Sequence, residues 1–183
     1  LSFDWFKFSY LGEPFFGFGL TKSLEMQLTL GYGVYAGEAY FADPEISYGE
    51  HRTTIIPVNV RMRVSPWDME NWNPYFYAGA GVMSFDLTTK PSEIASGEPT
   101  KDAGWAGIFP FGIGAEFILS DNVLFDFSLG GGFSTSYDLN GYKSESSKIW
   151  DSYINAGVGL TLLSESCESD KDTDGLGRCD EEK

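Results

Sequence analysis

The chain lacks any run of about 20 apolar residues, the length that a membrane-spanning helix requires. Its longest uncharged stretch, residues 103–115, contains four glycines and a proline, so helical membrane spans are excluded. Basic residues are also scarce, because 12 Lys and Arg stand against 27 Asp and Glu. A phosphate backbone is bound by clustered Lys and Arg, so this balance argues against a nucleic-acid partner.

Cysteine is absent from the first 166 residues and occurs only as Cys167 and Cys179. A closely spaced, even pair in a secreted chain predicts one disulfide, formed in an oxidising compartment. Aromatic residues are plentiful, at 16% of the chain, and there are 22 glycines. Disordered chains are poor in aromatic residues, so we expect a folded domain, and 183 residues are enough for one core.

Apolar and polar residues alternate with a period of two in five segments, a pattern typical of β-strands. The segments are 24–34, 56–64, 105–119, 123–129 and 153–162. In each of them one face is bulky and apolar, whereas the other is rich in glycine and carries charges of both signs. The charges predicted on the polar face are Glu25, Arg61, Arg63, Glu116 and Asp126.

This distribution suits a small closed barrel in a membrane, with glycine and paired charges in a narrow interior and apolar side chains facing lipid. Closure also leaves no unpaired backbone edge in hydrocarbon. Five charges in so narrow an interior predict a structural ion-pair network rather than a conduction path. A soluble, lipocalin-like barrel with its apolar face inside is the alternative fold.

Short and long connections alternate along the chain, which matches the periplasmic turns and extracellular loops of such barrels. The long, polar connections are 36–52, 86–104 and 135–148. We therefore predict an all-β fold: an eight-stranded antiparallel up-and-down transmembrane β-barrel over residues 1–163, followed by a short acidic tail over 164–183. The predicted strands are 1–9, 14–21, 24–36, 52–64, 74–86, 104–119, 122–134 and 148–163, with a turn at 11–14.

Two stretches of the chain resemble OmpA-like outer-membrane barrels. They are residues 54–82, which end in Asn-Pro-Tyr-Phe-Tyr-Ala-Gly-Ala-Gly-Val, and residues 111–117, Phe-Gly-Ile-Gly-Ala-Glu-Phe. The resemblance covers roughly residues 14–163. It implies a structural barrel in the outer membrane of a Gram-negative bacterium, in contact with its lipid. In that family a linker and a peptidoglycan-binding periplasmic domain often follow the barrel, so peptidoglycan is an implied partner through a domain beyond Lys183.

The tail from Cys167 to Gly175 resembles the start of a thrombospondin type 3 calcium repeat. Alternating Asp170, Asp172 and Asp174 would direct their oxygens at a hard cation such as Ca²⁺. Further Asp ligands do not follow Gly175 in register, so we expect weak calcium binding. A metal-free acidic linker is the alternative. In either case the last strand should deliver the tail into the periplasm.

Three classes of function are compatible with this fold. The sequence favours a non-enzymatic structural anchor, with an accessory subunit or binding module of a larger outer-membrane complex as the second class. The third is a lipid A-modifying enzyme. Its only candidate is His51, which has no Ser or Asp within two residues and is expected to be a solvated loop residue.

A set of aromatic residues is predicted to form girdles at the two membrane interfaces, because amphipathic rings favour the headgroup level. The members of this set are Trp5, Phe15, Phe16, Trp67, Trp72, Tyr75, Trp105 and Trp150.

Overall fold

The computed structural model describes residues 9–40, 47–67, 72–89, 101–120, 122–136, 139 and 151–163. They form one antiparallel sheet, and no helix occurs among them, which confirms the predicted all-β class. The strands are β1 (Tyr10–Gly12), β2 (Phe15–Thr21), β3 (Leu24–Leu30), β4 (Tyr32–Tyr40), β5 (Ser47–Val64), β6 (Trp72–Thr89), β7 (Ala103–Ser120), β8 (Val123–Ser134) and β9 (Ser152–Leu162). No helix of the described segments is long and apolar enough to span a membrane.

The nine strands lie in seven rows. β1 pairs with β4 and β2 pairs with β3, while β3 and β4 both pair with β5. Row one is therefore β1 and β2, interrupted at Glu13 and Pro14, and row two is β3 and β4, interrupted at Gly31. Pro14 has no N–H to give to the ladder, but its carbonyl accepts a hydrogen bond from Leu30 N at 3.1 Å. The remaining rows are β5 to β9 in chain order.

The predicted turn at 11–14 is wrong, because residues 10–12 form β1 and the chain continues in the same row after a short interruption. The predicted single strand 24–36 is two strands. Gly31 separates them at a place where a side chain would meet the ring of Pro57 at 2.7 Å. The predicted first strand, 1–9, lies outside the described residues except for Ser9.

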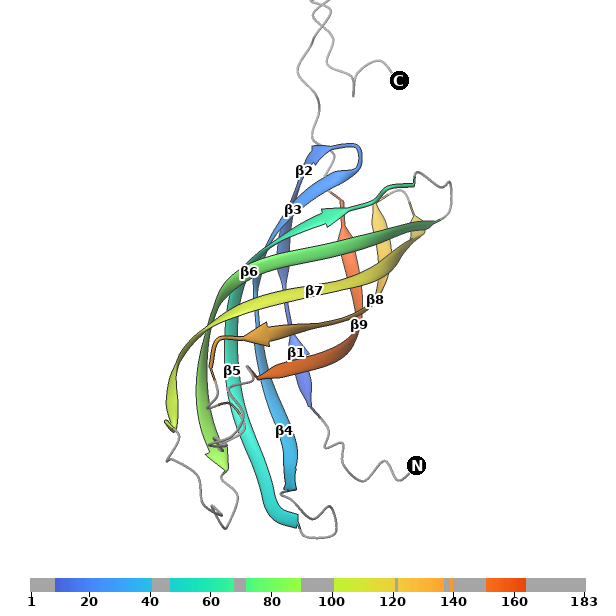
Figure 1. Cartoon of the computed structure of the whole chain (residues 1–183). Helices are drawn as coiled ribbons and strands as arrows, with labels where there is room; N and C mark the ends of the chain where they lie inside the picture. Colours follow the sequence, from blue (N-terminus) through green and yellow to red (C-terminus); the bar gives the residue numbers. More distant parts are fainter. Residues whose placement is uncertain are drawn as a thin grey trace, which may run out of the picture.

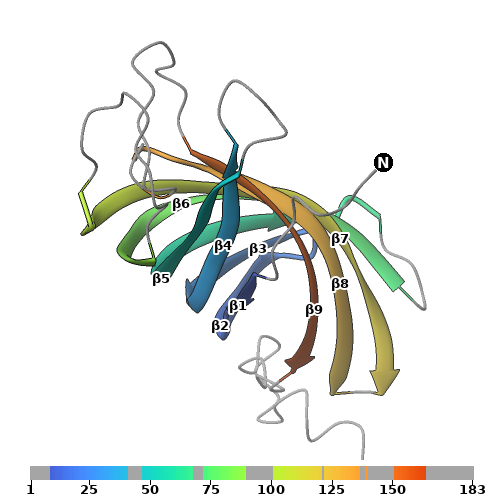
Figure 2. The ribbon, with the colours of Figure 1, turned by 90° about the horizontal axis from the view of Figure 1, so that it is seen from below.

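The sheet is strongly curled into a half-barrel with one concave and one convex face (Figures 1 and 2). The curl brings alternate strands into contact across the concave face, as the Arg63–Glu116 ion pair between β5 and β7 demonstrates. Row one and β9 are the two outer edges. Among the described residues neither edge is paired with another strand on its outer side.

Several strands extend further than predicted at the end of the sheet where the long connections lie. β4 continues to Tyr40, β5 begins at Ser47 and β6 continues to Thr89, into stretches that the sequence assigned to loops. We call this part the projecting section: residues 33–40, 47–55, 83–89 and 103–108. His51 lies here within β5, so the prediction of a loop position for it is wrong.

The projecting section has an apolar core on its concave face. The buried members of this core are Ile55, Met83, Phe85, Ala106, Ile108 and Leu139. Leu11 and Tyr35 pack against them. Leu139 is held in place because its carbonyl accepts a 2.5 Å hydrogen bond from Thr53 Oγ1 and its N–H donates to Asp151 Oδ2 at 3.0 Å. The convex face of the same section is mostly polar, with Arg52, Thr54, Ser84 and Asp86 among its side chains, although Trp105 is also exposed there.

Replacing Ile55, which is only 1% exposed, tests this core. We expect Ile55→Ala to lower the free energy of unfolding by about 2–5 kcal/mol, because it leaves a cavity among packed side chains. The matched control is Ile56→Ala, one position along β5 on the exposed convex face, which should cost less than half as much. Urea unfolding followed by circular dichroism measures both, and equal losses would contradict a closed core at Ile55.

Candidate functional site

Beyond the projecting section, the convex face of the sheet is apolar. Its side chains on β5 are Ile56, Val58, Val60, Met62 and Val64, and all of them are exposed. On β6 to β9 the exposed convex set continues with Phe76, Val82, Phe109, Phe111, Ile113, Phe117, Phe127, Leu129, Val158, Leu160 and Leu162. Within the described part of this surface no convex position carries a charge. In a soluble protein so large a continuous apolar surface would be unusual.

The concave face of the same region is polar and buried. Gln27, Thr29, Asn59, Arg63 and Glu116 are all less than 9% exposed. Fully buried polar and charged side chains are rare unless they are paired. The arrangement is therefore inverted relative to a soluble sheet, with the charges inside and the large apolar side chains outside.

The change from normal to inverted polarity occurs at one level across adjacent strands. On β5 it falls between the buried, concave Ile55 and the exposed, convex Ile56. On β6 the corresponding doublet is the concave Met83 and the convex Val82. These residues pair with Pro57 and Val58, which lie two positions after Ile55 and Ile56 along β5. On β7 the doublet is Ile108 and Phe109, and Ile108 pairs with Gly81 beside Val82. Two adjacent apolar residues on each strand thus mark a common boundary.

Arg63 is the centre of the ion-pair network on the concave face. Its guanidinium forms two hydrogen bonds to the carboxylate of Glu116 and lies 3.6 Å from Glu25. The guanidinium also lies 3.9 Å above the ring centroid of Tyr75, whose hydroxyl donates to Asp126 at 2.6 Å. Strands β3, β5, β6, β7 and β8 are therefore joined by side chains across the inside of the curl.

Arg61 makes a second set of contacts toward row one. It pairs with Glu13 at 2.5 Å, and its Nε donates to Asn59 Oδ1 at 2.8 Å. Its guanidinium lies 5.4 Å from the ring centroid of Tyr77. Sequence reasoning missed Glu13, because it placed this residue in a turn. Asp126, which was predicted to face inward, is bonded to a tyrosine and not to an arginine.

Glycines on β7 and β8 provide the space for the tyrosine rings. A side chain at Gly112 would meet Tyr77 Cε1 at 2.6 Å, and side chains at Gly114 and Gly130 would overlap Tyr75 and Tyr77. The rings can approach the backbone this closely only because these positions have no Cβ. The rings in turn cover backbone that glycine leaves open, and they support the two guanidinium groups.

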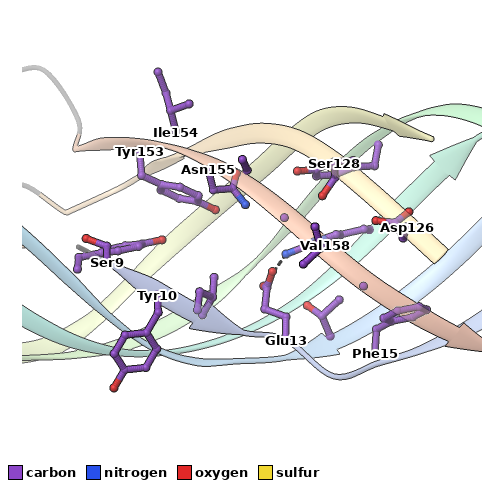
Figure 3. Close-up of a pocket in the computed structure, with 18 of the residues that line it drawn as sticks. Ser9, Tyr10, Glu13, Phe15, Asp126, Ser128, Tyr153, Ile154, Asn155 and Val158 are labelled. Carbon is purple, nitrogen blue, oxygen red and sulfur yellow. Dashed lines mark hydrogen bonds and ion pairs between the residues drawn. The ribbon is translucent and has the colours of Figure 1, made fainter. Parts of the chain in front are cut away.

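A cavity of about 1110 Å³ lies between this network and the outer edges of the sheet. Its lining includes Glu13 and Phe15 of row one, and Tyr153, Asn155 and Val158 of β9 (Figure 3). Because Val158 belongs to the convex side, the cavity reaches the unpaired edge of β9. His51 also lines it, with its ring against Gly37.

The aromatic residues divide between the two faces. Trp67 and Trp72 lie on the convex side near the short connections. The ring centroids of Trp67 and Phe76 are 6.4 Å apart, and those of the stacked pair Trp72 and Phe117 are 6.3 Å apart. Trp105 is 74% exposed on the convex side of the projecting section, three positions beyond the boundary residue Ile108 and opposite Ser84. The girdle prediction is wrong for Tyr75 and Phe15, because both line the concave cavity.

Two further members of the predicted girdle, Trp5 and Trp150, lie outside the described residues. The tail residues Asp170, Asp172, Asp174, Cys167 and Cys179 lie outside them as well. Among the residues that are described, no cluster of three or more His, Cys, Asp or Glu side chains could hold a metal ion.

Comparison with protein-family models, with curated proteins and with solved structures found no match to this chain. The resemblance of residues 54–82 and 111–117 to OmpA-like barrels therefore stays a prediction. The resemblance of the tail to a calcium repeat stays one too.

The Arg63–Glu116 pair gives a direct test of the network. We expect Arg63→Met to lower the free energy of unfolding by about 3–5 kcal/mol, because it leaves the Glu116 carboxylate buried without its partner. The control, Arg52→Met on the exposed convex side of the same strand, should change stability by no more than about 0.5 kcal/mol. Denaturant titrations measure both, and removing Glu116 as well should recover part of the loss. Equal effects of the two single variants would mean that the pair does not stabilise the sheet.

The packing of tyrosine on glycine predicts a second contrast. Gly130→Ala should cost about 1–3 kcal/mol through overpacking against Tyr77. Gly19→Ala is the matched control, because nothing lies within 4 Å of the methyl group that it would add. Combining Gly130→Ala with Tyr77→Phe should restore part of the stability, since the nearest atom to the new methyl is the Tyr77 hydroxyl. No rescue in the same titrations would rule out this contact as the cause.

Proposed function

We propose that the chain is a non-enzymatic structural protein of a Gram-negative outer membrane, whose sheet crosses the bilayer as the wall of a closed eight-stranded barrel. The observation that carries this proposal is the common level at which the polarity of β5, β6 and β7 inverts. On one side of that level the sheet has an apolar inside and a polar outside, as in water. On the other side the order is reversed, as a lipid-facing wall with a polar interior requires.

The spacing of the aromatic residues supports the same reading. Ser84, the partner of Trp105, lies twelve positions after Trp72 on β6. At ~3.3 Å per residue that is about 40 Å along the strand, and a strand tilt of about 40° reduces it to roughly 30 Å of height. An apolar band of about 25 Å fits between two aromatic girdles at that separation.

The concave network supports a structural role for the interior. Both arginines are held by carboxylates and covered by tyrosine rings, so the charged groups fasten strands together across the curl. Displacing the guanidinium of Arg63 would leave the Glu116 carboxylate buried without its partner, and displacing that of Arg61 would do the same to the half-buried Glu13. We therefore propose an interior that ties the wall together and does not conduct ions.

The tail is proposed to link this barrel to the cell wall from the periplasmic side. β9 ends beside the tight turn between β7 and β8, where Leu163 N donates to Asn122 O at 3.0 Å, so the tail begins at the end with the short connections. A disulfide between Cys167 and Cys179, weak Ca²⁺ binding by Asp170, Asp172 and Asp174, and contact with peptidoglycan through a following domain complete this proposal. Their support is the sequence of the tail.

A second candidate function, that of an accessory subunit of a larger outer-membrane complex, is favoured by one observation. The outer sides of row one and β9 are unpaired within the described part of the sheet, and an unpaired edge is a template for another strand. The two candidates differ in what covers these edges: a strand of this chain in a closed barrel, or a strand of a partner in a complex.

Arginine substitutions at two depths on one face test the membrane proposal. Val60→Arg lies midway along the apolar part of β5 and should cost about 2–4 kcal/mol in lipid, whereas Thr54→Arg, on the same face beyond the boundary, should cost about 0–1 kcal/mol. Urea titration of the full chain folded into phospholipid vesicles measures both, and vesicle flotation checks that the unmodified chain is embedded. A chain that stays soluble without detergent and tolerates both arginines equally would overturn the proposal.

A further inference from the structure

Unpartnered polar atoms gather around the cavity inside the curl. Within the described part of the chain, five buried side-chain nitrogen or oxygen atoms have no hydrogen-bond partner, and four of them belong to residues that line this cavity. The four residues are His51, Arg63, Asn155 and Thr161. Buried polar groups without a partner destabilise a fold and are rare, so their concentration on one cavity indicates an occupant that completes their hydrogen bonds.

The concave side of β9 forms a recess in the wall of this cavity. We call it the β9 recess, and its residues are Tyr153, Asn155, Gly157, Gly159 and Thr161. A methyl group added at Gly159 would have one neighbour within 4 Å, Asp126 Cβ at 3.6 Å, so there is open space in front of the strand here. These positions face the inside of the curl whichever strand covers the outer edge of β9, because edge pairing uses backbone groups and leaves the two faces unchanged.

Hydrogen-bonding groups are concentrated at the Asn155 end of the β9 recess. Asn155 pairs with Gly130, and a side chain at Gly130 would overlap the Tyr77 hydroxyl, so this hydroxyl lies beside Asn155. The Tyr153 hydroxyl lies over Gly132, 2.7 Å from the position that a Cβ would take there. Three polar groups from β6 and β9 therefore meet within two residues of one another on the cavity wall.

The unpartnered atoms fit an uncharged ligand that carries hydroxyl groups. Asn155 Oδ1 accepts hydrogen bonds, and the Thr161 hydroxyl both accepts and donates them. Burial lowers the pKa of His51, so its ring is neutral at pH 7 as well. Among the described residues three carboxylates and two arginines line the cavity, which disfavours an anion. Each of these carboxylates already accepts a hydrogen bond, so a cation would have to compete for them.

The β9 recess is elongated and has aromatic rings beside it. Asn155 and Thr161 lie six residues apart, about 20 Å along the strand at ~3.3 Å per residue. Tyr153 lies beside Asn155, while Phe15 of row one lies on the opposite side of the cavity (Figure 3). Aromatic rings combined with a few well-placed polar groups are typical of ligand pockets. A short chain of sugar units has the length, the apolar ring faces and the hydroxyl donors that these groups require.

We propose that the β9 recess binds a short, uncharged oligosaccharide, whose hydroxyl groups donate hydrogen bonds to Asn155 and Thr161 and whose rings pack against Tyr153 and Phe15. Binding goes beyond the structural role proposed above and leaves the ion pairs of the concave face intact. Water is the other occupant that could complete these hydrogen bonds. Water requires neither the aromatic rings nor a recess of this length.

Titration calorimetry on the full chain tests the site, in a detergent whose headgroup contains no sugar. The probes are the uncharged tetrasaccharides maltotetraose and cellotetraose, together with glucose, choline and inorganic phosphate. We expect at least one tetrasaccharide to bind, and to bind at least fivefold more tightly than glucose, which is too short to reach both Asn155 and Thr161. Asn155→Leu and Thr161→Val should each weaken that binding at least fivefold, because each removes one hydrogen-bond partner. Gly159→Leu should abolish it by filling the recess.

Thr53→Val is the matched control, because the Thr53 hydroxyl donates to the Leu139 carbonyl and does not line the cavity. This variant should lower the urea midpoint for unfolding and leave tetrasaccharide binding unchanged. Asn155→Leu and Thr161→Val should not lower that midpoint, because the atoms that they remove have no partner in the described part of the protein. Their loss of binding is then distinct from a loss of folding.

Three results would overturn the proposal. If neither tetrasaccharide binds to the unmodified chain, water is the occupant. Binding that Asn155→Leu, Thr161→Val and Gly159→Leu all leave unchanged would place the sugar elsewhere on the molecule. Tighter binding of choline or inorganic phosphate than of either tetrasaccharide would assign the recess to a charged ligand.

Discussion

A strand has two faces, and in this sheet both faces change polarity at the same level. The need to place both changes at one level fixes the register of neighbouring strands. If β5 slipped by one residue against β6, Ile55 would leave the apolar core and Arg63 would turn away from Glu116. The stabilising contacts of both halves of the strand would therefore be lost together. The long strands β5, β6 and β7 are therefore fixed at both ends by opposite requirements, and neither end can adjust alone.

The concave face satisfies its part of this requirement through three kinds of residue that depend on one another. Glycines of β7 and β8 let tyrosine rings approach the backbone closely, the rings cover the guanidinium groups, and carboxylates from other rows neutralise those groups. Because the partners come from alternate strands, their contacts hold the rows at the separation that a strongly curled sheet requires. The same side-chain contacts therefore pair the charges and maintain the curvature of the sheet.

Much of the fold could be predicted from the alternation of residues, which located β5, β7, β8 and β9 and the polar side of each. β6 was predicted from the order of the short and long connections. The outer ends of the projecting section, residues 37–40, 47–51 and 87–89, could not, because polar residues such as Glu50 and Thr88 make the sequence there look like a loop. The doublet Ile55–Ile56 was an available signal, since it breaks the alternation where the polarity inverts. Glu13 was missed because Pro14 suggested a turn, and the pairing of Asp126 with Tyr75 depends on register across three strands that spacing does not reveal.

The boundary doublets also limit how this protein can vary in length. Inserting one residue between Ile55 and Ile56 would restore an unbroken alternation, yet it would rotate the projecting part of β5 by half a turn and expose its core. Inserting two residues would keep every face, if the neighbouring strand gained two as well. Natural variants of this chain should therefore differ in the height of the projecting section by matched pairs of residues on adjacent strands. Odd-numbered insertions and deletions should be confined to the connections beyond the strand ends.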